Sequence, residues 1–261
     1  VWQNCGNLER LSFHESTLLS LGNVDTARCS KGLIKLVLVK TIPSVLDAVV
    51  RAFRHLRKLK IVTGNPSFIS TITPLKYLKD LTICWLPDDD TGLSESFASF
   101  GVEEGAVPLS SLSLCGINCD LSAFFSSRRC SSLKKINFRS CKIPESCFGI
   151  LAGQARESLQ CISCGNDTGE AAAVLLESCK NVRDVVLGFH EHESFCRIGE
   201  KSVARPKRAS FERLSGLALT SASDSIVSFL ENVEDLSIVF GTVSPFSLFE
   251  QIFSRCPNIR V

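Results

Sequence analysis

Aliphatic residues recur along this chain in a six-residue pattern, LxxLxL, in which positions one, four and six are aliphatic. The pattern begins ten times, at Leu8, Leu33, Leu56, Leu78, Leu109, Leu133, Leu159, Val182, Leu214 and Val233. Successive starts lie between 19 and 32 residues apart. A repeat of this length is too short to bury its own apolar face, so neighbouring repeats must stack on one another. The pattern therefore predicts a repeat protein of about ten units, followed by a truncated eleventh at residues 257–261.

Each repeat is expected to contain a strand, a turn and a helix. Side chains alternate along a strand, so positions four and six face the core and positions three, five and seven face the other way. Apolar residues then recur at a spacing near 3.6, which is typical of helices. These patterns place helices at residues 44–54, 144–152, 168–177, 224–230 and 246–253, with a short helical segment at 67–74. Two longer intervals, near residues 85–108 and 190–210, are expected to be protruding loops.

This strand–turn–helix unit of about two dozen residues resembles the leucine-rich repeat, and the resemblance covers essentially the whole chain. It implies an α/β fold: a single right-handed horseshoe-shaped solenoid over residues 1–261, with a parallel sheet on the concave face and helices on the convex face. Residues 133–141, with Cys141 at the ninth position, are similar to the cysteine-containing repeats of F-box substrate adaptors. The ninth position differs in the other repeats. Such irregularity is also seen in the sensor repeats of NOD-like immune receptors.

These resemblances imply three alternative functions, none of them enzymatic. In the first, the chain is the substrate-binding region of an F-box-type ubiquitin-ligase adaptor, which positions a protein client for modification. In the second, it is the ligand-sensing region of a NOD-like receptor of innate immunity. In the third, it is a structural scaffold. The sequence has no phosphate-binding glycine loop and no G-x-S-x-G motif, and no catalytic residue, metal or cofactor is expected.

The bulk composition favours a protein partner. The chain has 29 basic and 27 acidic residues, and its net charge of +2 is too small to indicate binding to nucleic acid or to an anionic membrane. No apolar run reaches the roughly 18 residues that a transmembrane helix needs. The sequence contains no Met, so it is expected to be part of a longer protein.

Four of the thirteen cysteines occupy one recurring place, three residues before the first aliphatic position of a repeat. These are Cys5, Cys130, Cys179 and Cys256. Equivalent places in stacked repeats should all face inward, where a free cysteine behaves as a small hydrophobic residue. The odd total also leaves at least one thiol unpaired. Both observations favour a reducing compartment, the cytoplasm or the nucleus.

The outward positions of the strands predict a binding surface. These positions are basic in the first half of the chain, whereas in the repeats read as starting at Val182, Leu214 and Val233 they are small, apolar or acidic. We expect a protein partner with an acidic stretch to bind the basic part, with complementary charge speeding and orienting the encounter. The residues assigned to this surface are Arg10, His14, Lys35, Lys58, Lys60, Lys135, Asn137 and Arg139. The alternative is that these charges only keep an open sheet soluble.

Three shorter motifs have simpler explanations than a functional site. His190, His192 and Cys196 could ligate zinc, but no fourth ligand is close in sequence and the segment is expected to be a solvated loop. The pair in residues 161–164, C-x-x-C, should lie on opposite faces of a strand, which argues against a redox pair. The basic run at residues 205–210 could be a kinase site or a nuclear-import signal on an exposed loop, although such short patterns are common by chance.

Overall fold

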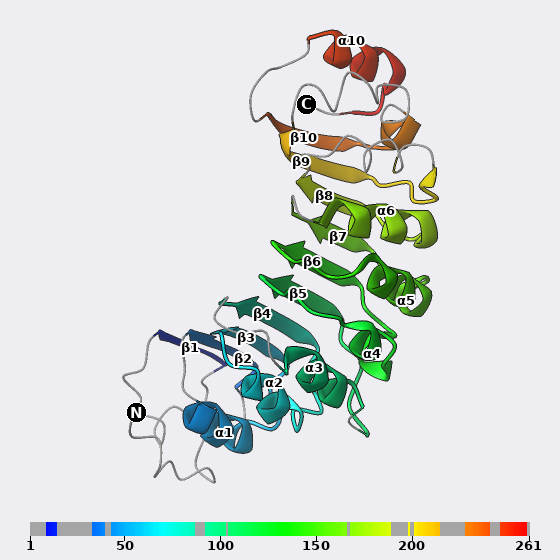
Figure 1. The fold of residues 1–261 in the computed structure, drawn as a ribbon. Coiled ribbons are helices and arrows are strands. Elements are labelled where there is room, and N and C mark those ends of the chain that lie inside the picture. The colour runs from blue at the N-terminus through cyan, green and yellow to red at the C-terminus, as the bar shows by residue number, and fades with distance from the viewer. Residues whose placement is uncertain are drawn as a thin grey trace. The chain divides into compact units, whose positions relative to one another are not determined.

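The computed structural model describes residues 9–14, 33–39, 43–86, 92–102, 104–165, 168–188, 198, 201–214, 228–240 and 246–259. The chain forms two compact units, Val1–Ser132 and Leu133–Val261. In each unit parallel strands alternate with helices along the chain, so the protein belongs to the α/β class (Figure 1). Within the described residues, no helix has the length and apolar character needed to cross a membrane.

The first unit contains a parallel sheet whose strands pair in chain order, so the sheet is not closed into a barrel. Its strands are β1 (Arg10–His14), β2 (Lys35–Val39), β3 (Lys58–Thr63), β4 (Asp80–Trp85) and β5 (Ser111–Cys115). Its helices are α1 (Pro43–Ala52), α2 (Ser67–Ile72), α3 (Leu93–Gly101) and α4 (Ser122–Phe125), followed by a 3-10 turn, η4 (Arg128–Cys130).

The second unit has the same organisation. Its strands are β6 (Lys135–Arg139), β7 (Cys161–Cys164), β8 (Asp184–Gly188), β9 (Arg208–Leu214) and β10 (Asp235–Phe240), again parallel and in chain order. Its helices are α5 (Glu145–Ala155), α6 (Gly169–Ser178) and α10 (Phe246–Arg255). Of the helix expected at 224–230, residues 228–230 are helical and the rest lie outside the described residues.

The aliphatic pattern forms the core because equivalent positions of successive repeats are aligned in the sheet. Leu36 in β2 pairs with Leu59 in β3, and Leu38 pairs with Ile61. All four are 2% exposed or less. The interior of one repeat thus continues directly into the next, as expected for stacked repeats. The first aliphatic position is buried in the same way from Leu33 onward, wherever the predicted register holds.

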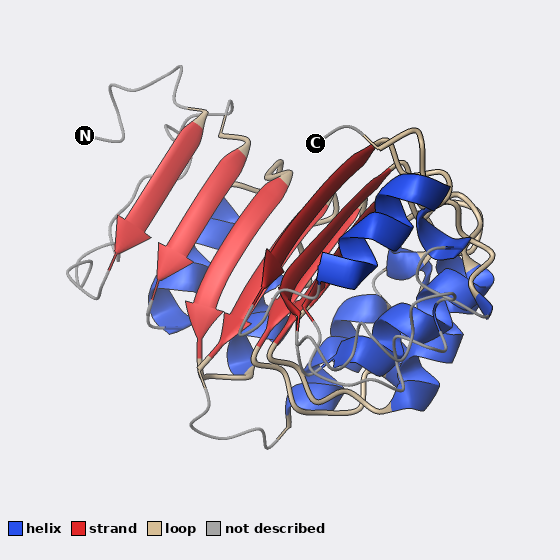
Figure 2. Ribbon diagram, turned by 90° about the horizontal axis from the view of Figure 1, so that it is seen from above, coloured by secondary structure: helices blue, strands red, loops and turns tan. Residues whose placement is uncertain are grey.

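Among the described residues, the helices of each unit lie on one face of its sheet. In unit 1 the helices follow one another along that face, and α1 contacts α2, α2 contacts α3 and α3 contacts α4. In unit 2, α5 contacts α6, and α6 contacts β7 and β8. The other face carries no helix among the described residues (Figure 2). Parallel sheets are usually buried on both faces, so an uncovered one is a distinctive feature.

Aromatic rings fill the layer between sheet and helices in unit 1. The ring of Phe124 lies 5.3, 5.9 and 5.7 Å from the rings of Phe97, Phe100 and Phe125. Arg129 is buried beside them, with its guanidinium 4.5 Å from the centre of the Phe100 ring. It donates hydrogen bonds to the carbonyls of Thr73 and Leu75 at 3.3 and 3.4 Å. Arg129 therefore supplies hydrogen-bond donors to two backbone carbonyls beside the aromatic rings.

The two segments that were predicted to be loops contain secondary structure, because their apolar residues pack into the core. The first predicted loop, near residues 85–108, contains α3, whose Leu93, Phe97 and Phe100 are fully buried. The second, near residues 190–210, contains the start of β9. The ninth repeat therefore begins at Pro206 and not at Leu214, and its buried positions are Pro206, Ala209 and Phe211. With this register the repeat starts 24 residues after Val182 and 27 before Val233.

Candidate binding surface

The uncovered face of each sheet presents positions three, five and seven of the repeats. We call this surface the open face of the unit. In unit 1 the register places Arg10, Lys35 and Lys58 side by side at position three of successive strands. Neighbouring strands lie about 4.8 Å apart, so these three cations form a like-charged row. All three residues are exposed.

Only part of this row is neutralised within the protein. The Lys58 ammonium lies 2.7 Å from the Asp80 carboxylate on the next strand. Lys35 and Lys60 are exposed and form no ion pair with any described residue. His14 lies at the end of β1, opposite Val39. The open face of unit 1 therefore retains positive charge that an acidic partner could neutralise.

The other predicted site residues lie on β6 in unit 2. Lys135 and Arg139 are exposed, and Asn137 is half-buried between them. The Oδ1 atom of Asn137 is shielded from solvent and accepts no hydrogen bond from the described residues. Because this atom has no accessible surface, a partner could reach it only after the Asn137 side chain rotated. The structure places these three residues on one strand but in a different unit from Arg10, Lys35, Lys58 and Lys60.

Unit 2 differs from its prediction because of the corrected register of β9. Position three of its strands holds Lys135, Cys161, Asp184, Arg208 and Asp235, which we call the charge ladder. The expected Gly216, Ala218 and Thr220 lie outside the described residues, and their places in the sheet are taken by residues of β9. The prediction that the last three repeats are small, apolar or acidic is therefore wrong for the ninth.

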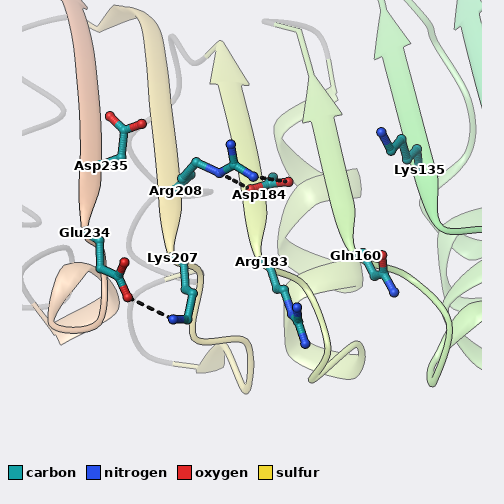
Figure 3. Close-up of a pocket in the computed structure, with 8 residues that line it drawn as sticks. All are labelled: Lys135, Gln160, Arg183, Asp184, Lys207, Arg208, Glu234 and Asp235. Carbon is teal, nitrogen blue, oxygen red and sulfur yellow. Dashed lines mark hydrogen bonds and ion pairs between the residues drawn. The ribbon is translucent and has the colours of Figure 1, made fainter.

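One ion pair lies within this ladder and a second lies beside it (Figure 3). Arg208 Nε donates a hydrogen bond of 2.7 Å to the Asp184 carboxylate on β8. Just before the strands, Lys207 Nζ lies 2.9 Å from the Glu234 carboxylate. These pairs are largely exposed, so each contributes little to stability but fixes the direction of its side chains.

A polar cleft of about 790 Å³ follows the ladder along one end of the strands. Its lining residues come from positions two and three of the repeats, and include Lys135, Gln160, Arg183, Asp184, Lys207, Arg208, Glu234 and Asp235. Lys135, Arg183 and Asp235 form no ion pair with a described residue. The sequence prediction missed the position-two residues because it counted only side chains within the strands. Their signal was present, since position two is polar in most repeats.

The thiol of Cys161 lies within the ladder but is a poor nucleophile. Burial raises its pKa above the usual value, and the nearby Asp184 carboxylate raises it further, while Lys135 and Arg208 lower it less strongly. Cys164, three residues later, is on the buried side of the same strand. The prediction that these two cysteines face opposite ways is therefore confirmed. All ten cysteines in the described residues are free thiols.

The remaining motifs are placed as follows. Cys130, Cys179 and Cys256 are buried at their recurring place, as predicted, whereas Cys5 lies outside the described residues. His190, His192 and Cys196 also lie outside them. The basic residues of the run at 205–210, Arg205, Lys207 and Arg208, are exposed as predicted, but residues 208–210 belong to β9 and not to a loop.

Comparison with known protein families and with curated proteins finds no match for this chain. The functional argument therefore depends on the geometry and charge of the open faces.

Proposed function

We propose that this chain is a protein-recognition module of the leucine-rich-repeat type, with a horseshoe-shaped solenoid architecture. The observation that carries the proposal is the open face of its parallel sheet. Such a surface is the usual binding site of stacked-repeat proteins. It offers regularly spaced side chains on a rigid backbone, so partner binding requires little ordering of the protein.

The partner that fits unit 1 is a protein with an acidic stretch. Lys35 and Lys60 extend from adjacent strands and form no ion pair with a described residue. Complementary charge would speed and orient the encounter, and contacts around the cations would supply most of the affinity. The function is positioning and not chemistry, so we propose no catalytic residue.

Within this class we favour the substrate-binding region of an F-box-type ubiquitin-ligase adaptor, acting in the cytoplasm or nucleus. The support is the cysteine at the ninth position of the repeat that begins at Leu133. Cys141 is fully buried, and its thiol donates a hydrogen bond of 3.3 Å to the Arg139 carbonyl at the end of β6. A buried cysteine at this position is the feature that residues 133–141 share with the adaptor repeats they resemble.

Affinity purification of the full-length protein from its own cells tests the proposal. We expect one set of proteins to be lost when Lys35, Lys60 and Arg139 are all changed to Glu. The matched control changes Lys142, Arg156 and Lys201 to Glu, which are exposed outside the strands and give the same change in net charge. Ligase subunits should remain bound to both variants. Identical recovery of all proteins by the wild type and both variants would reject the open face as the binding surface.

A further inference from the structure

A second basic surface lies beside the open face of unit 1, where strands β3 and β4 begin. The 26 residues from Arg54 to Lys79 contain six lysines and arginines and no aspartate or glutamate. A net charge of +2 for the whole chain conceals this local excess. Four of these six cations come from two similar tetrads. Residues 54–57 read Arg-His-Leu-Arg, and residues 76–79 read Lys-Tyr-Leu-Lys.

The fold brings these two tetrads side by side. They occupy the same place in adjacent repeats, and the Lys79 backbone N–H donates a hydrogen bond of 2.9 Å to the Arg57 carbonyl. The leucines of both tetrads, Leu56 and Leu78, are buried. Burial of the leucine fixes each tetrad against the core, so its three polar members point outward. We call the exposed members of both tetrads the basic rim.

An aromatic pair forms the centre of the basic rim. The rings of His55 and Tyr77 stack with centres 5.4 Å apart and planes inclined by 30°. Tyr77 is 52% exposed, which is unusual for a large ring in a well-packed repeat. Stacking restricts both side chains before any partner binds. An exposed and already ordered tyrosine can bury apolar area at a small cost in conformational entropy.

Each ring of this pair has cations on either side of it in its tetrad. Arg54, Arg57 and Lys79 are exposed and form no ion pair with a described residue. Lys76 is exposed as well. An arginine beside a tyrosine is the composition found at the centres of protein interfaces, where aromatic residues and arginine dominate the binding energy.

We propose that the basic rim binds an acidic segment of a protein partner, with carboxylates on Arg57 and Lys79 and one apolar side chain on the His55–Tyr77 stack. This inference rests on the proposed function, because it assigns partner chemistry to the edge of the same binding region. Two features favour a protein segment over a nucleic acid. The rings are stacked on each other and not separated to admit a base, and the adjacent Lys58–Asp80 pair shows that a carboxylate fits among these cations.

Fluorescence anisotropy with a labelled peptide, in which glutamates flank one central leucine, tests the inference. We expect binding that weakens as salt concentration rises, and a loss of about tenfold or more in the Arg57→Glu/Lys79→Glu variant. The Lys142→Glu/Lys201→Glu control carries the same change in net charge away from the rim, and should bind as the wild type does. Circular dichroism confirms that each variant is folded.

Two further probes isolate the chemistry. Tyr77→Ala should weaken the leucine peptide severalfold but leave unchanged a peptide with glycine in place of leucine. Oligodeoxythymidylate of equal charge should bind more weakly than the leucine peptide. Binding of this oligonucleotide as tightly as the peptide, or equal effects of the rim variant and its control, would overturn the inference.

The same measurement separates the rim from the proposed function. Loss of peptide binding in Lys35→Glu/Lys60→Glu alone would support the open face and overturn the rim. Loss in the rim variant alone would support the rim and contradict the open face as the site of acidic partners.

Discussion

The two units use one backbone plan but distribute charge differently at equivalent places. Position three in unit 1 begins with three cations, Arg10, Lys35 and Lys58, of which Lys58 alone pairs with a described carboxylate, whereas in unit 2 Asp184 and Arg208 alternate in sign and pair. A repeat fixes where a side chain stands but not what it neutralises. In such a protein, the charge available to a partner depends on the residue opposite each charged side chain on the next strand, and not on the number of charges in a repeat.

The interiors differ as well. In unit 1 the layer behind the sheet is filled by the rings of Phe97, Phe100, Phe124 and Phe125. The helices of unit 2 bury small residues, among them Cys147, Ala152, Ala155 and Ala171–Ala173. Small residues let a helix approach the sheet closely, whereas rings hold it further away. The same repeat thus tolerates two ways of filling its core, provided that volume and shape are matched.

The largest effect on stability is expected from changing the size of a core residue in either unit. Phe124→Ala should destabilise the protein by about 3–5 kcal/mol, because it leaves a cavity between three rings. Ala172→Leu, in the tightly packed helix α6, should cost about 1–3 kcal/mol through overpacking. Urea unfolding monitored by circular dichroism measures both. If each change were nearly neutral, the two interiors would not be as distinct as the structure indicates.

Buried and partly exposed thiols are expected to differ in reactivity, which is a smaller effect and is not confined to one unit. Burial raises the pKa of Cys164 to about 12 and that of Cys179 to about 11, from an ordinary value of 9.0. In unit 1, Cys84, Cys115 and Cys119 are partly exposed. At pH 8, iodoacetamide should therefore label these three cysteines well before Cys164 and Cys179, as measured by peptide mass spectrometry.

The same shifts predict that unit 2 loses stability in alkali. Below pH 9 both thiols are protonated in the folded and unfolded states, and their contribution is fully present. Above pH 9 the unfolded thiols ionise while the folded ones do not, so the contribution falls until the pH passes the folded values near 11 and 12. The expected loss at pH 10 is about 1–2 kcal/mol per thiol. A Cys164→Ala/Cys179→Ala variant should show a smaller decline, because the buried Cys130 thiol still contributes; an unchanged pH dependence would contradict this prediction.

The aliphatic pattern predicts much of the fold, but it places the ninth repeat wrongly. The strands that the pattern places after Leu33, Leu56 and Leu78 are observed where expected, because each aliphatic position is also a core position. The ninth repeat fails because its core residues, Pro206 and Ala209, are not large aliphatics. Residues 214–219 match the pattern better, but the ninth strand is Arg208–Leu214. The uneven spacing around Leu214 was the available signal, since the true start restores even intervals.

The binding surface was predictable only in part, for a related reason. Lys35 and Lys60 could be assigned outward from strand alternation alone. Whether a charge is neutralised depends on its neighbour across the sheet, and Arg208 meets Asp184 only in the corrected register. The stack of His55 on Tyr77 likewise depends on the 22-residue offset between two adjacent repeats and on the packing of loops before the strands. Sequence pattern does not specify such loop contacts.

The smallest expected effect tests whether pairing, and not location, makes unit 2 differ from unit 1. Asp184→Asn removes the carboxylate that binds Arg208 and leaves an unpaired cation in the charge ladder. In the Arg57→Glu/Lys79→Glu background, this change should tighten binding of the acidic peptide about two- to fivefold, consistent with the modest energy of an exposed ion pair. Stability should change little for the same reason.

Glu157→Gln is the matched control for this last change. It breaks another exposed ion pair in unit 2, Lys180–Glu157, and raises the net charge by the same amount, but it lies outside the ladder. Equal gains from both variants would mean that net charge alone governs peptide affinity. A gain restricted to Asp184→Asn, and lost at high salt, would show that unit 2 has the geometry to bind acidic segments and that its own carboxylates occupy the cations. On that result, the two units would differ in whether their cations are paired with carboxylates of the protein, and not in where those cations lie on the sheet.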